Sequence, residues 1–463
     1  LPGEAIGVLL PASAAAQMAF FAIHLAGKLP VMMNWTTGPA NLAHAVRTLD
    51  VRHVVTARRV IDRLRIEVEG AEYVFLEDLR KEMGGVELAR AMAASYLAPR
   101  RFLKAGGGQN PDAPAVVLFT SGSESKPKAV PLTHRNLLSN CRAALVASEF
   151  TRADVILGAL PPFHSFGLLG NLIAPAVAGI GVVFHPDPTD ARGLVRATAT
   201  YRTTVLITTP TFLGYIFAAA TADDLKSLRI IVTGAEKCPE ALFGQSTELA
   251  PGAVVLEGYG ITECSPVVSG NRIGKSRPGT VGLPLDGVEV CVVDPDTGRP
   301  LPNGRTGMLL VRGPSVFSGY LNHDGPDPFV ELDSHRWYKT GDLVMLDDEQ
   351  FIHFRGRLKR FLKAGGEMIS LPALEEPLTR CFPPREDGPQ VAVEGVEGPD
   401  GPHVVLFTTR DLPLREANRI LADAGFRGVM RIHESRRIDA IPVLGTGKTD
   451  YKVLRKLVTE QSQ

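Results

Sequence analysis

Short apolar runs recur along the chain from about residue 100 onward, and each is followed by a loop rich in Gly, Ser, Thr or Pro and then by a helix-compatible stretch. Runs of this length predict buried strands, and strands alternating with helices predict an α/β domain with largely parallel sheets. Because such folds bind ligands beyond the carboxyl ends of their strands, we expect a site in the following loops. The runs are Val116–Phe119, Val155–Leu160, Val205–Ile207, Arg229–Val232 and Val254–Leu256.

The pattern changes beyond Gly279, where short apolar runs separated by turn sequences predict a smaller β-rich subdomain. After Arg357 the pattern predicts a compact α+β unit that ends in a helix from Tyr451. We therefore expect an N-terminal domain of residues 1–356, with its β-rich subdomain at about 280–356, and a C-terminal domain of residues 357–463.

Two segments near the start of the large domain need separate interpretation. Ile6–Leu10 predicts a core strand and is followed by a predicted helix, so we expect further sequence upstream, because a domain rarely begins on a core strand. Phe166 to Phe184 carries no charge over nineteen residues, a length that can span a bilayer. Pro175 and four glycines in this segment instead favour a buried helix, turn and strand.

Composition narrows the classes of function. The chain has 463 residues, 44% hydrophobic, and its 50 basic residues balance its 50 acidic ones. No basic face is implied, so we expect no nucleic-acid partner. The five scattered cysteines favour a reducing, cytoplasmic environment over a disulfide or zinc framework, and we expect all of them to be buried. They are Cys141, Cys238, Cys264, Cys291 and Cys381.

The loop after the strand Val116–Phe119 is the most informative motif. It reads Thr-Ser-Gly-Ser-Glu-Ser-Lys-Pro-Lys over residues 120–128. Its hydroxyls, backbone N–H groups and lysines predict a cradle for the oxygens of a polyphosphate. The spacing differs from that of a P-loop ATPase, and the similar ending at Gly447-Lys448-Thr449 lacks the required first glycine, because Pro442 stands there.

Two further loops carry residues suited to a nucleotide site. In Gly258–Glu263, Tyr259 can lay its ring on a purine, while Thr262 and Glu263 offer oxygens to phosphate and Mg²⁺. The alternative is a turn with a surface glutamate. His164 lies between two aromatic residues and is either a packed histidine or a wall between a nucleotide site and an apolar tunnel.

The region around the predicted domain boundary contributes two more candidates. Asp342 follows Gly341 at a predicted turn, where it can accept both hydroxyls of a ribose or simply cap the turn. The basic segment Phe354–Glu367 predicts either a solvated linker or a short strand pair at a hinge around Gly365 and Gly366. Lys448, on a glycine loop in the terminal domain, could be delivered to a site by domain rotation.

In this order and spacing the motifs resemble the adenylate-forming superfamily of acyl-CoA synthetases, peptide-synthetase adenylation domains and luciferases. The resemblance implies a large N-terminal domain of two α/β layers plus a β-rich subdomain, a small mobile α+β C-terminal domain, and a missing beginning of the usual N-terminal domain. Lys28–Gly38 and Ala364–Ser370 look like the acyl-ACP synthetase half of the bifunctional 2-acylglycerophosphoethanolamine acyltransferase/acyl-ACP synthetases, in which an acyltransferase domain precedes the synthetase.

The resemblance implies that a fatty-acid carboxylate attacks the α-phosphorus of ATP, with Mg²⁺, and that the acyl adenylate then passes to the phosphopantetheine thiol of acyl carrier protein. It implies catalytic roles for Lys448, Glu263, Thr262 and His164, with Glu263 on Mg²⁺ and Lys359 as the hinge. The residues implied to bind the nucleotide are Thr120, Ser121, Gly122, Ser123, Lys128, Gly234, Ala235, Glu236, Tyr259, Gly260, Asp342 and Arg357.

The sequence leaves alternatives open. The phosphate loop has Ser125 and Ala129 where the family usually has glycine, and Ala129 is tolerable only if its φ is negative. Coenzyme A is the rival acceptor, as in a medium- or long-chain acyl-CoA synthetase, and a non-catalytic nucleotide- or acyl-binding module is the rival from another class. The resemblance also implies a fused or associated acyltransferase and a lysophospholipid at the inner face of a bacterial inner membrane.

Overall fold

The computed structural model divides the chain into two compact units. The larger unit comprises residues 1–290, 311–338 and 350–352, and the smaller comprises residues 291–310, 339–349 and 353–463. The predicted boundary at residue 356 stays a prediction. The structure describes residues 4–97, 110–120, 127–364, 367–385, 388–398, 401–443 and 449–460.

The first sheet of the larger unit has six strands in the order β4-β3-β1-β2-β5-β6. All neighbours pair in parallel except β5 and β6, which form an antiparallel hairpin across the predicted phosphate loop. The predicted core strand at the start of the chain is therefore central in this sheet. The strands are β1 (Ala5–Val8), β2 (Leu29–Met32), β3 (His53–Thr56), β4 (Glu72–Phe75), β5 (Pro114–Phe119) and β6 (Ala129–Thr133).

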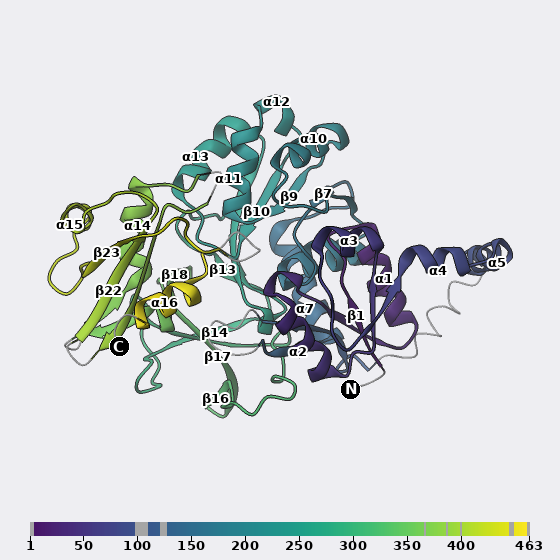
Figure 1. Cartoon of the computed structure of the whole chain (residues 1–463), viewed down its shortest axis with the longest axis horizontal. Helices are drawn as coiled ribbons and strands as arrows, with labels where there is room; N and C mark the ends of the chain where they lie inside the picture. Colours follow the sequence, from purple (N-terminus) through teal and green to yellow (C-terminus); the bar gives the residue numbers. More distant parts are fainter. Residues whose placement is uncertain are drawn as a thin grey trace. The chain divides into compact units, whose positions relative to one another are not determined.

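Among the helices of this region, α1 and α7 begin where local side chains satisfy their free N–H groups. Ser13 caps α1 by accepting from the Ala16 N–H, and Thr133 forms a capping box with Asn136 at the start of α7. The helices are α1 (Ala14–Leu25), η1 (Trp35–Thr37), α2 (Pro39–Leu49), α3 (Arg58–Leu64), α4 (Leu76–Glu82), α5 (Gly85–Leu97) and α7 (His134–Ser148). In Figure 1, α4 and α5 extend outward from this sheet, and neither helix has a buried residue.

The second sheet of the larger unit has seven strands in the order β13-β12-β11-β10-β9-β7-β8. The run from β11 to β8 is parallel, as the alternation of strands and helices predicted, and β12 and β13 add antiparallel strands. The strands are β7 (Val155–Gly158), β8 (Gly181–Phe184), β9 (Val205–Thr208), β10 (Ile230–Gly234), β11 (Val254–Gly260), β12 (Val267–Gly270) and β13 (Leu283–Pro284).

The uncharged segment from Phe166 forms the predicted helix, turn and strand, as short helical turns, a turn at Gly179 and strand β8, but the predicted burial was wrong for β8, which has no buried residue. Within the described part of the chain, no helix combines the length and apolar character needed to cross a bilayer. The helices of this sheet are α8 (Ser165–Gly167), η2 (Leu168–Ile173), α9 (Ala174–Ala178), α10 (Ala191–Tyr201), α11 (Pro210–Ala219), α12 (Ala222–Leu225), α13 (Glu240–Leu249) and η3 (Thr262–Cys264).

The β-rich region forms a sheet in the order β14-β15-β17-β16, and β18 also pairs with β17. The strands are β14 (Glu289–Val293), β15 (Thr306–Arg312), β16 (Phe329–Leu332), β17 (His335–Leu346) and β18 (Ile352–Arg357). One prediction was wrong here: Asp342 lies inside β17 and not at a turn between two strands. Gly341 adopts φ 71° within this strand, which explains why a turn-like Gly-Asp sequence occurs in an extended segment.

The C-terminal part of the smaller unit is α+β, as predicted. A buried cluster that includes Leu374, Val404 and Leu421 joins its helices to a three-stranded sheet. The predicted short strand pair is confirmed, because β19 and β20 pair antiparallel, and its role as a hinge stays a prediction. The elements are η4 (Leu358–Arg360), β19 (Phe361–Ala364), β20 (Glu367–Ser370), α14 (Leu371–Cys381), β21 (Val391–Gly398), β22 (Gly401–Thr408), α15 (Leu414–Asp423), β23 (Glu434–Arg437) and α16 (Tyr451–Thr459).

All five cysteines are free thiols, and the expectation that all of them are buried was wrong for two. Cys141, Cys238 and Cys264 are buried, whereas Cys291 is half-buried and Cys381 is exposed at the end of α14. Burial raises the pKa of Cys141 to about 11 and that of Cys238 to about 12, so both thiols stay protonated at neutral pH.

Candidate active site

Part of the predicted nucleotide site of the larger unit lies at and just after the carboxyl ends of β10 and β11. These strands pair in parallel with Gly234 opposite Gly258, so the loops after them leave the same edge of the sheet. The first loop carries Ala235 and Glu236, and the second carries Glu263. Both loops therefore follow strand ends, as the sequence pattern predicted.

Glycines let the backbones approach closely at this edge. A Cβ on Gly234 would lie 3.0 Å from the carbonyl oxygen of Gly258, and one on Gly260 would lie 2.3 Å from the carbonyl oxygen of Pro266. The second separation is too short for any side chain. Tyr259, between Gly258 and Gly260 in β11, is buried and pairs with Ser269 of β12. Its predicted stacking on adenine stays a prediction.

Glu236 is fixed from outside the loop that carries it. Its Oε2 accepts hydrogen bonds from the Thr211 hydroxyl at 2.6 Å and from the Thr211 backbone N–H at 3.3 Å, at the beginning of α11. Its Oε1 is buried and accepts no hydrogen bond from a described residue. The contacts show how this carboxylate holds the loop, and Ala235 beside it takes the left-handed φ of 70°.

A second buried carboxylate, Glu257, was missed by the sequence reasoning. It lies two residues before Tyr259 in β11 and accepts a hydrogen bond from the Cys238 backbone N–H at 2.9 Å. Burial raises the pKa of Glu257 to about 7. A glutamate in the middle of an apolar strand was the sequence signal that could have identified it.

His164 lies in an aromatic cluster, and the residue that follows it contacts the loop after β11. Its ring centroid is 4.6 Å from that of Phe163, which in turn is 4.4 Å from that of Trp35. The neighbouring Ser165 hydroxyl is 3.3 Å from that of Thr262. The packed-histidine interpretation accounts for these contacts, and a catalytic role for His164 stays a prediction.

The ends of the predicted phosphate loop close on each other. The Thr120 N–H donates to the Lys128 carbonyl at 3.1 Å, and the Lys128 N–H donates to the Thr120 hydroxyl at 3.4 Å. Ala129 begins β6 and does not have a positive φ. An alanine is therefore tolerated at this position, where the family usually has glycine. Ser121, Gly122, Ser123 and Ser125 lie outside the described residues.

Glu263 is buried beside a tyrosine that the sequence reasoning did not identify. The Tyr320 hydroxyl donates to Glu263 Oε1 at 2.7 Å, while the Lys128 Nζ lies 4.6 Å from the centroid of the same ring. Burial and the nearby Glu263 carboxylate raise the pKa of Tyr320, so its hydroxyl remains a donor at neutral pH. A Gly-Tyr pair after a strand was the only local signal.

In the smaller unit, the two predicted ribose residues lie together. Arg357 Nε is 3.3 Å from Asp342 Oδ1, and the Asp342 N–H donates to the Thr340 hydroxyl at 3.0 Å. The Asp342 side chain is 1% exposed, whereas that of Arg357 is 62% exposed. The arginine therefore places a cation at the surface above a buried carboxylate.

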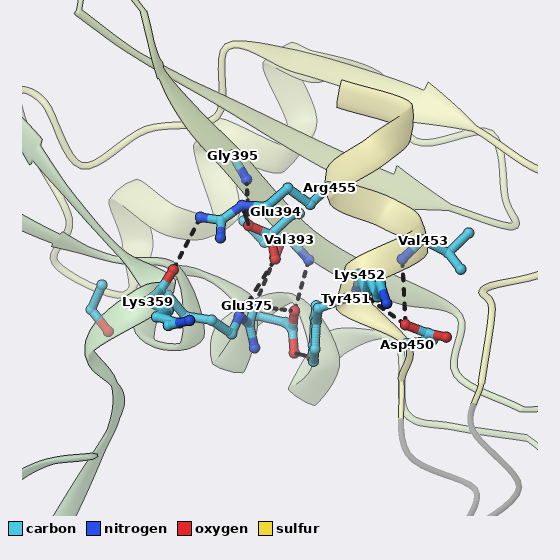
Figure 2. Close-up of polar contacts among 12 residues, drawn as sticks. Lys359, Glu375, Val393, Glu394, Gly395, Asp450, Tyr451, Lys452, Val453 and Arg455 are labelled. Atoms are coloured by element: carbon cyan, nitrogen blue, oxygen red, sulfur yellow. Dashed lines mark hydrogen bonds and ion pairs between the residues drawn. The ribbon is translucent and has the colours of Figure 1, made fainter. Parts of the chain in front are cut away.

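The predicted hinge residue is tied to the last helix. Figure 2 shows Arg455 of α16 reaching both Lys359, whose carbonyl accepts its hydrogen bond at 3.0 Å, and Glu394, at 3.6 Å. Next to Lys359, Arg360 pairs with Glu375 at 3.2 Å and lies over the Tyr451 ring at 3.5 Å. This buried charge network joins the segment after β18 to α16 within the smaller unit.

Lys448 lies outside the described residues, so its predicted catalytic position stays a prediction. In the sequence it comes two residues before Asp450, which caps α16 by accepting from the N–H groups of Lys452 and Val453 (Figure 2). Within the described parts of the chain, no group of three or more His, Cys, Asp or Glu side chains is arranged to hold a metal ion.

Comparison with known proteins identifies the family. The model of the AMP-binding enzyme family matches residues 1–321, and the chain belongs to that family. Its relatives include a 4-coumarate–CoA ligase of Pinus taeda, 26% identical, over 98% of this chain and 85% of that protein. A feruloyl-CoA synthase of an Amycolatopsis species is 29% identical over 81% of this chain and 73% of that protein.

Solved structures agree with the observed architecture. ATP-bound MatB from Rhodopseudomonas palustris aligns with a TM-score of 0.80 at 25% identity, covering 100% of this chain and 90% of that one. O-succinylbenzoate coenzyme A synthetase from Bacillus subtilis, in complex with ATP and magnesium, gives a TM-score of 0.81 at 21% identity, over 99% and 90%. The predicted α/β class, with a large N-terminal and a smaller C-terminal domain, is confirmed.

Proposed function

We propose that the protein is an AMP-forming acid–thiol ligase that activates a fatty acid with ATP and transfers the acyl group to a phosphopantetheine thiol. The observation that carries this proposal is the joint contact of Lys128 and Glu263 with Tyr320, which brings the end of the phosphate loop and the end of β11 together. The relatives named as CoA ligases and the ATP complexes of similar structures support the same class of reaction.

The first step needs positioning and charge neutralisation, because a carboxylate and a triphosphate repel each other. Thr120, Ser121, Gly122, Ser123 and Lys128 would hold the β- and γ-phosphates. The Lys128 ammonium, over the Tyr320 ring, has no ion pair with a carboxylate of a described residue and would meet the phosphates. Attack of the fatty-acid oxygen on the α-phosphorus then forms the acyl adenylate and releases pyrophosphate.

The chemistry of Glu263 fits Mg²⁺, a hard cation that prefers oxygen ligands. Its Oε1 already accepts from Tyr320, and no hydrogen bond from a described residue reaches Oε2. Glu263 would hold the metal through this second oxygen, and Thr262 would contact the phosphates. Bound Mg²⁺ would supply neutralisation of the phosphate charge.

The adenosine would lie along the strand ends of the larger unit. Tyr259 would stack on the adenine, with Gly234, Ala235 and Glu236 on its other side and Gly260 leaving room for the backbone to approach. The wall next to the apolar acyl group would include His164.

The smaller unit would supply groups for both steps. Asp342 and Arg357 would bind the ribose, and Lys448 would bridge the carboxylate and the α-phosphate during adenylation. Rotation about Lys359 would remove Lys448 before a thiol attacks the adenylate to form the thioester and AMP.

The preferred acceptor in this proposal is acyl carrier protein, because of the sequence likeness at Lys28–Gly38 and Ala364–Ser370. Coenzyme A is the second candidate, favoured by the names of the curated relatives. We would expect an associated acyltransferase and a lysophospholipid at the cytoplasmic face of the membrane only if acyl carrier protein is the acceptor.

Purified protein incubated with fatty acid, ATP and Mg²⁺ tests the proposal when holo-acyl carrier protein and coenzyme A are supplied in separate reactions. Thioester with the carrier protein and little with coenzyme A is the expected result. Thioester with coenzyme A alone would replace the first acceptor by the second. A lack of acid-dependent AMP release with either acceptor would contradict the ligase assignment and favour a binding module.

A further inference from the structure

The segment Pro314–Leu321 makes backbone hydrogen bonds both to the start of β6, just after the predicted phosphate loop, and to the turn that follows β11. In the middle of the segment, the Phe317 N–H donates to the Glu263 carbonyl at 2.8 Å. At its end, the Leu321 N–H donates to the carbonyl of Ala129, the residue after Lys128, at 3.0 Å. The backbone therefore places Tyr320 between two charged residues that are far apart in the sequence.

Tyr320 contacts each charge with a different part of its side chain. The hydroxyl donates to Glu263 Oε1 at 2.7 Å, and the ring face lies 4.6 Å from the Lys128 ammonium. A hydrogen bond to a carboxylate and a cation–π contact each fix the direction of their partner. One side chain thus orients an anion and a cation together.

The tyrosine itself is held in place by its neighbours. Its ring packs edge-on against Phe317 at 4.9 Å and His323 at 5.3 Å between centroids, and the Tyr338 hydroxyl lies 3.4 Å from its own. Residues positioned this way keep a single rotamer, which is what a supporting residue of a site requires.

We propose that Tyr320 is a positioning residue for Mg²⁺-dependent ATP binding: its hydroxyl holds Glu263 so that Oε2 is left for the metal, and its ring holds the Lys128 ammonium for the phosphates. This inference rests on the proposed function. The two parts of the side chain have separable effects, because Tyr320→Phe removes the hydroxyl alone and Tyr320→Leu removes the ring as well.

Isothermal titration calorimetry with ATP, in the absence of fatty acid, measures binding without turnover. For Tyr320→Phe we expect the Kd for ATP in EDTA to match that of the native protein. Mg²⁺ should lower this Kd in both proteins, but the Mg²⁺ concentration that gives half of the decrease should be about tenfold higher in Tyr320→Phe. For Tyr320→Leu we expect the Kd in EDTA to rise about fivefold as well, through Lys128.

Tyr73→Phe is the matched control. The Tyr73 hydroxyl also makes hydrogen bonds inside the larger unit, accepting from the Val68 N–H and donating to the Ile66 carbonyl, away from the site. This variant should lose similar stability and keep the native Mg²⁺ dependence. If Tyr320→Phe keeps the Mg²⁺ dependence of the unmutated protein, the positioning role of Tyr320 is wrong and the proposed function is unaffected. If the unmutated protein binds no ATP, both the positioning role and the proposed function are wrong.

Discussion

Arg357 Nε lies 3.3 Å from Asp342 Oδ1, joining the end of β18 to the middle of β17 within the smaller unit. The aspartate is almost completely buried and the arginine is mostly exposed, so a ligand at the surface meets the guanidinium with the carboxylate directly beneath it. In the proposed mechanism this pair binds the ribose.

Asp342→Asn preserves the shape of the side chain and removes its charge. We expect the KM for ATP to rise about thirtyfold, the equivalent of about 2 kcal/mol for hydrogen bonds to a charged group. Steady-state kinetics of AMP release measures this change. Asp347→Asn is the control, because Asp347 pairs with His353 at 3.1 Å in the same unit and has no proposed role. An unchanged KM in Asp342→Asn would contradict the ribose assignment.

Asp154 stabilises the larger unit as a buried anion. Burial alone would raise the pKa of Asp154, but hydrogen bonds from Arg229, Thr151 and Thr204 hold it well below its usual range. A depressed folded pKa stabilises the protein above the pKa of the unfolded state, and this stabilisation is lost as the pH falls towards the folded value.

Asp154→Asn should therefore cost about 3 kcal/mol at pH 7, because it leaves Arg229 without its anion. Urea denaturation at pH 7 and pH 3 measures the difference from the native protein, which should narrow at pH 3. Asp112→Asn, at the exposed pair with Arg135, should leave the transition nearly unchanged. Equal destabilisation at both pH values would show that the charge of Asp154 is not the cause.

The contribution of Glu257 to stability should depend on pH in the opposite direction to that of Asp154. Its folded pKa is about 7, above the usual value of 4.5, so the folded state holds the proton more tightly than the unfolded state. Stability should fall as the pH rises from about 4.5 to about 7, by about 3 kcal/mol in total.

Glu257→Gln keeps an oxygen that can accept from the Cys238 N–H and removes the buried charge. Relative to the native protein, we expect it to be stabilised at pH 8 and nearly neutral in effect at pH 4.5. Thermal unfolding across this range tests the sign. Destabilisation at pH 8 would mean that the ionised carboxylate has a favourable partner.

Gly260 is required by the close approach of two backbones. The Cβ of Gly260→Ala would lie 2.3 Å from the Pro266 carbonyl oxygen, so we expect a loss of about 3 kcal/mol in the free energy of unfolding. Gly270→Ala, in the neighbouring strand β12, meets nothing within 4 Å and should change stability by less than about 0.5 kcal/mol. Chemical denaturation of both variants measures the contrast, and equal effects would contradict the steric argument.

The sequence could predict strands and the loops at their ends, because apolar runs and turn residues are local signals. It placed Gly234, Tyr259 and Glu263 correctly at one edge of the second sheet. It also identified the short strand pair around Phe361 and Ser370 from an apolar and glycine pattern, while the hinge role of this pair stays a prediction.

Contacts between distant segments could not be predicted in this way. Tyr320 meets Glu263 across 57 positions, and nothing near it in the sequence marks it as a partner of a carboxylate. The extended conformation around Asp342 was also missed, because Gly-Asp usually signals a turn and only the pairing of β17 with its neighbours keeps the strand continuous.

In the proposed reaction, the chain first converts a carboxylate and ATP into an acyl adenylate and pyrophosphate. Exchange of labelled pyrophosphate into ATP tests this step directly, with and without fatty acid, in the native protein and in Lys448→Ala. We predict exchange that depends on fatty acid in the native protein and is abolished in Lys448→Ala, while the variant still forms thioester from supplied acyl adenylate. Absence of acid-dependent exchange in the native protein would contradict the account, and exchange that survives in Lys448→Ala would refute the role of that lysine.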